Sequence, residues 1–390
     1  MHLACLPASG GVIVSCILFT FMPDTTEQPA PLKDSPTDIL HFEKWLAILG
    51  ERQATDLHLA VGNVPMLRLD GAITPLLEED ILTAERLNTI VRHLLAEDEL
   101  KILESEREVI VSQTLKKVMR FRIHVFYSRS FLSLSMRYLP AEEPNLEALG
   151  LPDLIKECRT AERGLLFITG PFDSGRTTTV RALLSAINQT RADYIVTLEK
   201  PIEYLIPSVK SVVVQRAIGR DAKDFASALT ALNEEDANVI VISKLDTQET
   251  VEQALTLAAS GRLIIAVGDS RHALGLIEQL RDLFPESQRS RVLSLLADSL
   301  IGIVAQLLLP RLGGGRILIS EVLRGTNPVK SLIRDNKLVQ LRTIMQTARA
   351  EGMVTLDQSL AQAVKSGSVA LATAKEQAID QNQFNSLVSH

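Results

Sequence analysis

The chain has 390 residues, of which 46% are hydrophobic and 23% are charged, and its formal net charge is −6 at pH 7. This composition predicts a folded protein with a packed core and two or three domains, and it gives no support to general nucleic-acid binding, which needs an excess of Lys and Arg. With only three cysteines, Cys5, Cys16 and Cys158, no disulfide framework or zinc site can be built, and we expect a reducing, cytoplasmic environment.

Residues 1–38 are expected to form a leader outside the folded part. No Lys or Arg precedes the apolar run 12–21, so the charged start of a secretory signal is missing. The run is also shorter than the roughly 20 residues that a helix needs to span a bilayer. Three interpretations stay open: a true start at or near Met22, a disordered or membrane-touching tail, and an export signal. Residues 23–38 are rich in Pro, Thr, Glu and Asp and predict a flexible segment.

An α+β domain is expected at residues 39–140. Apolar residues at helical spacing predict helices at 39–53 and at 84–103, the latter as one helix or a pair. Short runs, several of them with polar and apolar residues alternating, predict strands at 56–59, 66–69, 109–112, 120–127 and 133–139. The turn Asp70-Gly71 closes the second of these strands. Residues 141–150 begin with AEEP and predict a linker, because Pro and charged residues interrupt both patterns.

A second domain is expected at residues 151–328, where short apolar runs alternate with helical segments. The runs lack polar alternation, which is typical of strands buried on both faces of a mostly parallel sheet. They lie at 165–169, 194–198, 239–242 and 263–267. Helices at 177–188, 222–233, 248–259 and 273–283 fit crossover connections between parallel strands. Residues 329–390 are expected to be mostly helical, with breaks at Gly352 and Gly367.

The strongest local motif is a phosphate-binding loop at residues 164–179, GLLFITGPFDSGRTTT. It runs from a buried strand through a Gly-rich turn into a helix, where backbone N–H groups and the helix N-terminus bind phosphate oxygens. Arg176 stands where the motif has Lys, and the hydroxyl of Thr177 is of the type that holds Mg²⁺. The candidate nucleotide contacts are Gly170, Ser174, Gly175, Arg176, Thr177 and Thr178.

From about residue 39 to residue 378 the sequence resembles the retraction ATPases of type IV pili, the PilT/PilU-type branch of the secretion-ATPase family. In the first domain the matching stretches are DLHL at 56–59, MLRLDG at 66–71 and RFR at 120–122. In the second part they include TGP at 169–171, PIE at 201–203, GGG at 313–315 and PVKSLIRDNK at 328–337. The last stretch resembles a helix motif that the retraction branch carries near its C-terminus.

The resemblance implies a RecA-like P-loop NTPase core with a smaller N-terminal α+β (PAS-like) domain and a helical C-terminal segment. It also implies a hexameric ring at the cytoplasmic side of the inner membrane, where ATP and Mg²⁺ bind and hydrolysis drives pilus retraction and twitching motility. The implied partners are a related pilus ATPase in a homo- or hetero-hexamer and the inner-membrane platform protein, with no nucleic acid.

Four catalytic elements depart from the family pattern, and two of them concern the phosphates. In the phosphate loop, Asp173 and Arg176 replace Gly and Lys, which predicts weak nucleotide binding because a carboxylate repels a triphosphate. In the segment TLEKPIEY, Glu199 and Glu203 remain as residual catalytic carboxylates, but Lys200 replaces Asp. For both segments a purely structural interpretation, as an inherited turn and as surface charges, stays open.

The other two departures concern hydrolysis. Ser243 stands where relatives have the Glu that activates water, and a positioned general base contributes roughly 10² to 10⁴ in rate. Asp246 persists, and we interpret it as the N-cap of the following helix. Asp269 replaces a sensor His and Arg262 an upstream one, so we expect the γ-phosphate sensor to be absent and His272 to be a surface residue.

Arg120, Arg122 and Arg137 match family positions that reach a neighbour's nucleotide. Arginine suits this because its planar fork donates two hydrogen bonds to phosphate, although alternating arginines can also keep a strand face hydrated. We therefore predict a member of the pilus machinery with weak or no hydrolysis, acting as partner or regulator of an active motor. An active motor whose missing base is replaced by Glu199, Glu203 or Glu249 is the alternative. An assembly-side ATPase ranks lower, because the catalytic domain lacks a cysteine-rich metal segment.

Overall fold

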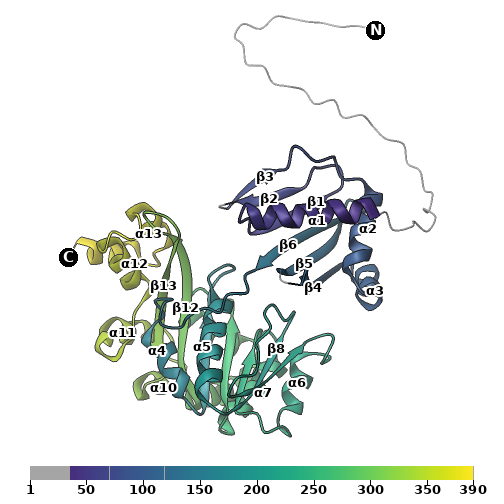
Figure 1. Ribbon diagram of the computed structural model, residues 1–390. Helices are drawn as coiled ribbons and strands as arrows, with labels where there is room; N and C mark the ends of the chain where they lie inside the picture. Colours follow the sequence, from purple (N-terminus) through teal and green to yellow (C-terminus); the bar gives the residue numbers. More distant parts are fainter. Residues whose placement is uncertain (1–35, 70, 118, 390) are drawn as a thin grey trace, which may run out of the picture.

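The computed structural model describes residues 36–69, 71–117 and 119–389. The leader, with the candidate start at Met22 and the apolar run 12–21, lies outside the described residues, as does the turn residue Asp70. Two α/β units are present, each with its own sheet and core (Figure 1). We call them the N-terminal unit, from α1 to β6, and the core unit, from α4 to α14. In the described ranges, no helix has both the length and the apolar content needed to cross a membrane.

The N-terminal unit is an antiparallel sheet with three helices on one face. Its strand order is β3-β2-β1-β6-β5-β4. The helices are α1 (Pro36–Glu51), α2 (Ala84–Leu94) and α3 (Glu97–Glu106). The strands are β1 (Asp56–Ala60), β2 (Met66–Leu69), β3 (Ala72–Pro75), β4 (Glu108–Leu115), β5 (Met119–Ser128) and β6 (Phe131–Leu139). Because side chains alternate along a strand, Phe121 and Ile123 of β5 are buried in the core with Trp45, whereas Arg120 and Arg122 lie on the opposite face.

The core unit is built on a seven-stranded sheet of order β13-β12-β7-β11-β10-β8-β9. All of its neighbouring strands are parallel except β12 and β13, which pair antiparallel. The strands are β7 (Gly164–Thr169), β8 (Tyr194–Glu199), β9 (Val212–Ala217), β10 (Val239–Ile242), β11 (Leu263–Gly268), β12 (Leu300–Pro310) and β13 (Arg316–Arg324). Every residue of β7 and β10 is buried, as the unbroken apolar runs predict.

Helices cover both faces of this sheet. One face packs against α4 (Asp153–Glu157) and α5 (Arg176–Thr190), in a core that contains Leu166 and Ile168 of β7. The alternate residues Leu165 and Phe167 belong to the core of the other face. The helices of that face include α6 (Phe225–Ala231), α7 (Gln248–Ala259), α8 (Ala273–Asp282) and α9 (Glu286–Ser299). The expectation of a mostly parallel α/β sheet is thus confirmed.

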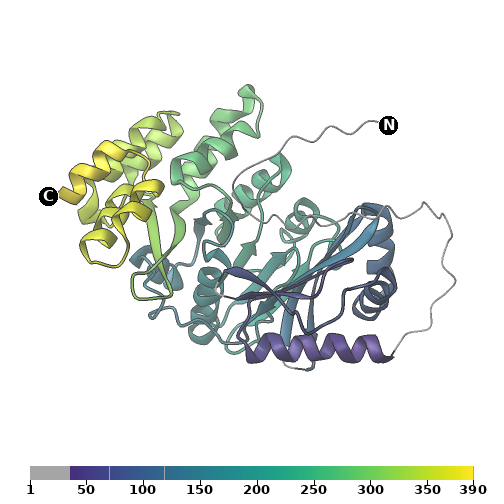
Figure 2. The same ribbon diagram turned by 90° about the horizontal axis from the view of Figure 1, so that it is seen from above.

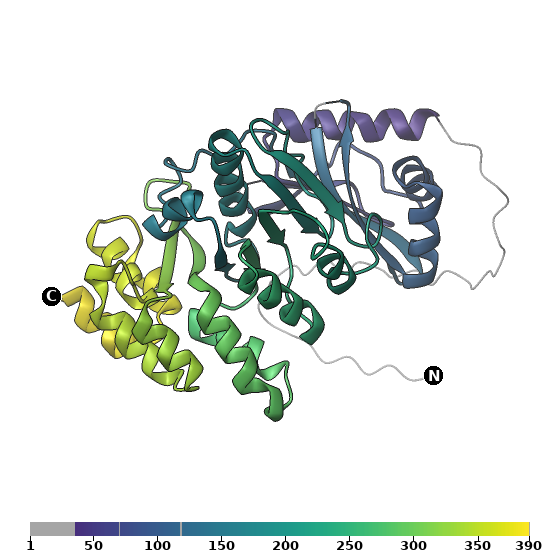
Figure 3. The same cartoon turned by 90° about the horizontal axis from the view of Figure 1, so that it is seen from below.

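The C-terminal helices lie at the end of the molecule opposite the helices of the N-terminal unit (Figures 2 and 3). They are α10 (Asn327–Arg334), α11 (Val339–Thr347), α12 (Leu356–Lys365), α13 (Leu371–Gln377) and α14 (Gln381–Ser389). Gly352 and Gly367 both have positive φ angles, of 78° and 68°, and break the helices where the sequence predicted. The buried carboxylate of Glu321 in β13 accepts hydrogen bonds from the backbone N–H groups of Ala273 and Leu356, the first residues of α8 and α12.

Candidate functional site

The predicted phosphate loop connects β7 to α5 and keeps the glycine geometry that the motif requires. At Gly170 an added Cβ would lie 2.3 Å from the carbonyl oxygen of Gln306, so no larger residue fits. Gly175 has a φ of 87° and is the N-cap residue of α5, which begins at Arg176. Ser174 is buried, whereas Thr177 and Thr178 are exposed on the first turn of α5. The backbone therefore has the form of a phosphate-binding loop, and binding of Mg²⁺ by the Thr177 hydroxyl stays a prediction.

The side chain of Asp173 does not project freely into this site. Its φ of 63° is the left-handed conformation, which Asp tolerates better than most residues. Its Oδ1 accepts from Nη2 of Arg137 at 2.8 Å, and its Oδ2 from Nη1 of Arg316 at 2.7 Å. The Arg137 guanidinium also lies 5.7 Å from the centre of the Phe172 ring. Two cations therefore offset the negative charge that the sequence placed in the loop.

Arg176, at the position of the motif's Lys, is turned to the end of β11. Its Nη1 donates to the carbonyl oxygen of Gly268 and to the carboxylate of Asp269. The Arg176 side chain is 17% exposed and that of Asp269 is 73% exposed, so the pair lies at the mouth of the site. Two residues singled out from the sequence thus contact each other, and the cation of the loop is engaged by the protein itself.

The acidic segment after β8 contains two carboxylates in different environments. Oε1 of Glu199 accepts from the Thr197 hydroxyl at 2.6 Å and from Nε2 of Gln215 at 3.0 Å. Burial raises the pKa of Glu199, and these two hydrogen bonds act in the opposite direction. Glu199 ends β8, which is separated from β7 and its phosphate loop by β11 and β10, so it is a candidate proton acceptor that does not contact the loop in this structure. Glu203 instead forms an ion pair with Arg122 at 3.0 Å.

The three candidate arginines of the N-terminal unit all contact the core unit of their own chain. Nη2 of Arg120 donates to the carbonyl oxygen of Ile202 at 2.7 Å, and its Nε to that of Glu203. Burial lowers the pKa of Arg120. Arg122 and Arg137 pair with Glu203 and Asp173. Arg137 thus contacts the phosphate loop and the other two contact the segment after β8, all within one chain, and their contact with a neighbour's nucleotide stays a prediction.

The end of β10 has no carboxylate at the position of the expected general base. The backbone N–H of Ser243 donates to the carbonyl oxygen of Leu198 at 3.0 Å. The interpretation of Asp246 as an N-cap is wrong, because Thr247 caps α7 by accepting from the N–H of Thr250. Asp246 instead pairs with Lys244 at 2.6 Å. A cavity of about 190 Å³ lies beside this segment, between Lys244 and Asp269, with Phe167 and Leu280 in its apolar wall.

The expectation for His272 needs correction, and the structure separates Arg262 from Asp269. His272 is the half-buried N-cap residue of α8 rather than a surface histidine, and burial together with the charge of Arg271 lowers its pKa. Arg262 precedes β11, whereas Asp269 follows it, and a six-residue strand separates its ends by about 20 Å. Arg262 is therefore not part of a phosphate sensor. Its guanidinium donates to Ser260 Oγ at 2.6 Å and to the carbonyl oxygen of Glu235 at 3.1 Å.

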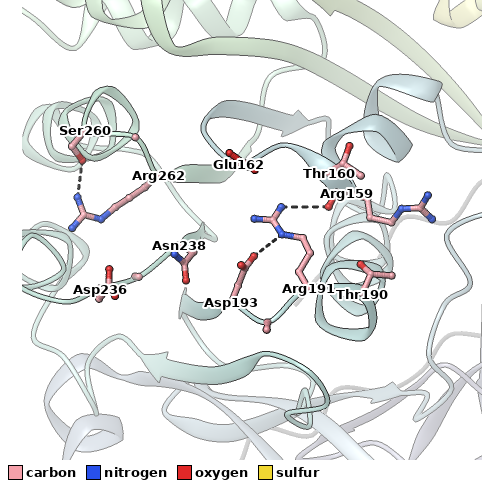
Figure 4. Close-up of a pocket in the computed structure, with 13 residues that line it drawn as sticks. Arg159, Thr160, Glu162, Thr190, Arg191, Asp193, Asp236, Asn238, Ser260 and Arg262 are labelled. Carbon is pink, nitrogen blue, oxygen red and sulfur yellow. Dashed lines mark hydrogen bonds and ion pairs between the residues drawn. The ribbon is translucent and has the colours of Figure 1, made fainter.

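Arg262 belongs to a hollow of about 1050 Å³ at the amino ends of the strands (Figure 4). Two of the arginines that line the hollow are bound by protein groups, Arg191 by Asp193 at 2.6 Å and Arg262 by Ser260 and backbone carbonyl groups. Open parallel sheets bind ligands at the carboxyl ends of their strands. The phosphate loop follows the carboxyl end of β7, at the opposite ends of the strands from this hollow, and is therefore the candidate nucleotide site. Among the described residues, no cluster of three or more potential metal ligands occurs.

Comparison with known proteins agrees with this geometry. Residues 43–314 match the family described as Type II/IV secretion system protein. The chain is 32% identical over 333 residues to the "Type IV pilus retractation ATPase PilT" of Pseudomonas aeruginosa, which covers 85% of this chain and 96% of that protein. It is 28% identical to the "Type IV pilus ATPase PilU" of the same organism, over 90% and 91% of the two chains. The crystal structure of the pilus retraction motor PilT with bound ADP superposes with a TM-score of 0.79 at 37% identity, and covers 87% of this chain and 97% of that one.

Proposed function

The chain belongs to the Type II/IV secretion system protein family, and from its PilT- and PilU-like relatives we propose that it serves type IV pilus retraction as a partner or regulator that hydrolyses ATP weakly or not at all. Its fold is a RecA-like P-loop NTPase core with a smaller N-terminal α+β unit and C-terminal helices. The proposed site of action is the cytoplasmic side of the inner membrane, at the base of the pilus.

The pair of Arg176 and Asp269 carries the proposal of weak hydrolysis. In a working phosphate loop the Lys is a compact charge that contacts the β- and γ-phosphates. Here the corresponding guanidinium donates to a carboxylate and a carbonyl of the same chain, so ATP must compete with these groups. Ser243 adds a second obstacle, because a hydroxyl cannot replace a carboxylate as the base that activates water.

The preserved architecture supports a function that depends on the fold. The glycine frame of the loop is intact, and the arginines of the N-terminal unit face the core unit. Helix α10, which contains most of the retraction-branch motif, buries Val329 and Ile333. It exposes Lys330 and Arg334, which contact Asp298 of α9. These features suit assembly with a related pilus ATPase in a homo- or hetero-hexamer, and docking on an inner-membrane platform protein.

ATP and Mg²⁺ are the proposed ligands, bound through backbone groups of the loop. Gly170, Ser174, Gly175, Arg176, Thr177 and Thr178 are the residues proposed to contact them. When bound, Mg²⁺ would neutralise phosphate charge, and the Thr177 hydroxyl is the side chain placed to hold it. Arg120, Arg122 and Arg137 would orient the phosphates from the N-terminal unit, if they exchange their present carbonyl and carboxylate partners for phosphate oxygens.

Purified full-length chain should show magnesium-dependent phosphate release at the background level, alone and with excess ATP. In the host cell, deletion of the gene should change pilus retraction or twitching although an active motor is present. An unchanged deletion strain would exclude a regulatory function. High ATP turnover by the purified chain would contradict the proposal that it hydrolyses ATP weakly or not at all.

The alternative is an active motor with a displaced base, and one observation favours it. Burial raises the pKa of Glu199, which would suit a general base near neutral pH. Glu199→Gln would abolish turnover in that case, whereas the matched variant Asp246→Asn, which removes a carboxylate paired with Lys244, would retain it.

A further inference from the structure

Asp173 in the phosphate loop joins three segments that are far apart in the sequence. Arg137 belongs to β6 of the N-terminal unit, and Arg316 is the first residue of β13 in the core unit. Each guanidinium donates to a different oxygen of the Asp173 carboxylate, at 2.8 Å and 2.7 Å. The carboxylate is therefore bound between two arginines from two elements, which is the arrangement that arginines commonly adopt around a phosphate group.

We propose that the Asp173 carboxylate is a tethered anion that takes the place of a nucleotide phosphate and holds the N-terminal unit closed on the phosphate loop. We call the group of Asp173, Arg137 and Arg316 the aspartate bridge. Closure of the two units then no longer requires nucleotide. The inference deepens the proposed function, since it describes how the same site would be regulated in a weakly hydrolysing subunit.

The position of Asp173 in the loop supports this assignment. Its left-handed backbone turns the side chain out of the strand-to-helix connection, and its side chain is 44% exposed at the face toward the N-terminal unit. The loop between Gly170 and Gly175 otherwise keeps the shape that receives phosphate. A carboxylate is thus placed at the loop that binds anions, and it already holds two of the cations that surround the site.

The aspartate bridge is not the sole polar connection between the units in the described residues. Arg120 and Arg122 also bind the segment after β8, through Ile202 and Glu203. Removal of Asp173 leaves this second contact in place, so the N-terminal unit should loosen over the phosphate loop rather than detach. Half-exposed ion pairs are individually weak and are screened by salt, so we expect a change of about tenfold in the ratio of closed to open forms.

The consequence for ligand binding has a defined direction. In the native chain a phosphate group competes with Asp173 for Arg137 and Arg316, and it also meets the repulsion of the carboxylate. Without the carboxylate the two arginines become free to bind phosphate, and closure becomes coupled to the nucleotide. Asp173→Gly should therefore gain affinity for ADP and at the same time lose closure in its absence.

The test measures the distance between the units by electron paramagnetic resonance on spin-labelled full-length chain. Labels are attached at Lys101→Cys in α3 and Lys223→Cys before α6, both at exposed positions. Cys5 and Cys16 are replaced by Ser, and the buried Cys158, whose pKa burial raises to about 12, does not react. The variants are Asp173→Asn and Asp173→Gly, which both tolerate the positive φ, and the control is Asp246→Asn, whose carboxylate pairs within the core unit.

With the aspartate bridge intact, the distance distribution should be narrow and unchanged by ADP with Mg²⁺, and it should broaden at high salt. Both Asp173 variants should give broad distance distributions without nucleotide. The distribution of Asp173→Gly should narrow when ADP is added, and this variant should bind ADP about tenfold more tightly than the native chain. Asp246→Asn should match the native chain. Distributions of the Asp173 variants that equal the native one, or a native distribution that narrows only with ADP, would overturn the inference. A separate phosphate-release assay decides on the proposed function, because turnover would contradict that function without changing these distances.

Discussion

Arg176, the first residue of α5, donates to the carboxylate of Asp269, which follows β11 and lies 93 positions along the chain. Each of the two residues offsets the charge of the other. An ion pair whose partner is largely exposed contributes little to stability. Its effect is geometric, because it holds the guanidinium at the end of β11, where the loop's cation meets a carboxylate instead of a phosphate.

The first prediction tests whether this pair limits nucleotide binding. Arg176→Lys alone leaves an ammonium that Asp269 still attracts, and Asp269→Asn alone leaves a bulky guanidinium in the loop. The double variant should bind a fluorescent ATP analogue at least about tenfold more tightly than either single variant, since contacting residues are non-additive. Asp298→Asn, which removes the partner of Arg334 between α9 and α10, is the matched control and should leave affinity unchanged. Equal affinities of the single and double variants would contradict the prediction.

The second prediction concerns the missing base. Ser243→Glu, placed in the Arg176→Lys and Asp269→Asn background, should raise magnesium-dependent phosphate release by roughly 10² to 10⁴ over that background, the usual contribution of a positioned general base. The same change in the native chain should have little effect, because the nucleotide remains poorly bound. Ser243→Gln introduces a side chain of the same size as Glu but without its charge, and it should not restore turnover. Turnover in the Ser243→Gln variant would show that a general base is not what the native chain lacks.

The third prediction uses the raised pKa of Glu199. A buried carboxyl with a raised pKa favours folding in its protonated form, so its stabilising contribution is complete below the unfolded pKa and is lost as pH rises through the folded pKa. Glu199→Gln keeps an oxygen that accepts from Thr197 and Gln215 but cannot ionise. The melting temperature of Glu199→Gln minus that of the native chain should therefore increase from pH 4 to pH 8. A difference in melting temperature that stays constant over this pH range would show that the pKa of Glu199 is not raised.

The parts of the fold that follow from local pattern could be predicted from the sequence. β7, β10 and β11 are unbroken apolar runs between turn residues, and the glycine frame with its following helix fixes the phosphate loop. β12 was not predicted, because its apolar run follows α9 directly, and such a run fits a helix or a strand equally well. β9, an edge strand with half-buried polar positions, was missed for lack of either period.

The contacts of the site depend on tertiary structure and had no local pattern. Asp173 and Arg176 were singled out from the sequence, but their partners Arg316 and Asp269 lie 143 and 93 positions away. The three glycines at 313–315 all have positive φ and form the turn that precedes β13, which begins at Arg316. This glycine run was the one local pattern from which the position of Arg316 after a turn could have been predicted. The pairing of Arg176 with Asp269 is visible only when the start of α5 and the end of β11 are placed side by side.

The last prediction concerns Glu321, which connects the sheet to two helices. Its buried carboxylate accepts from the N–H groups that begin α8 and α12, at 2.7 Å and 3.3 Å. A carboxylate at a helix N-terminus satisfies donors that have no partner within the helix and interacts favourably with the helix dipole. Glu321→Ala leaves both donors buried, and a loss of about 2 to 6 kcal/mol in the free energy of unfolding is expected, at ~1–3 kcal/mol for each of the two unpaired groups.

The loss should be local, because α8 follows the Asp269 segment and α12 is the first helix of the cluster formed by α12, α13 and α14, whereas the N-terminal unit has its own core. Hydrogen exchange should therefore accelerate in α8 and α12 of the Glu321→Ala variant and stay unchanged in α2. Glu321→Gln retains one acceptor oxygen, so its exchange rates in α8 and α12 should lie between those of Glu321→Ala and those of the native chain. Uniform acceleration in all helices would mean that Glu321 supports the whole core rather than these two helix ends.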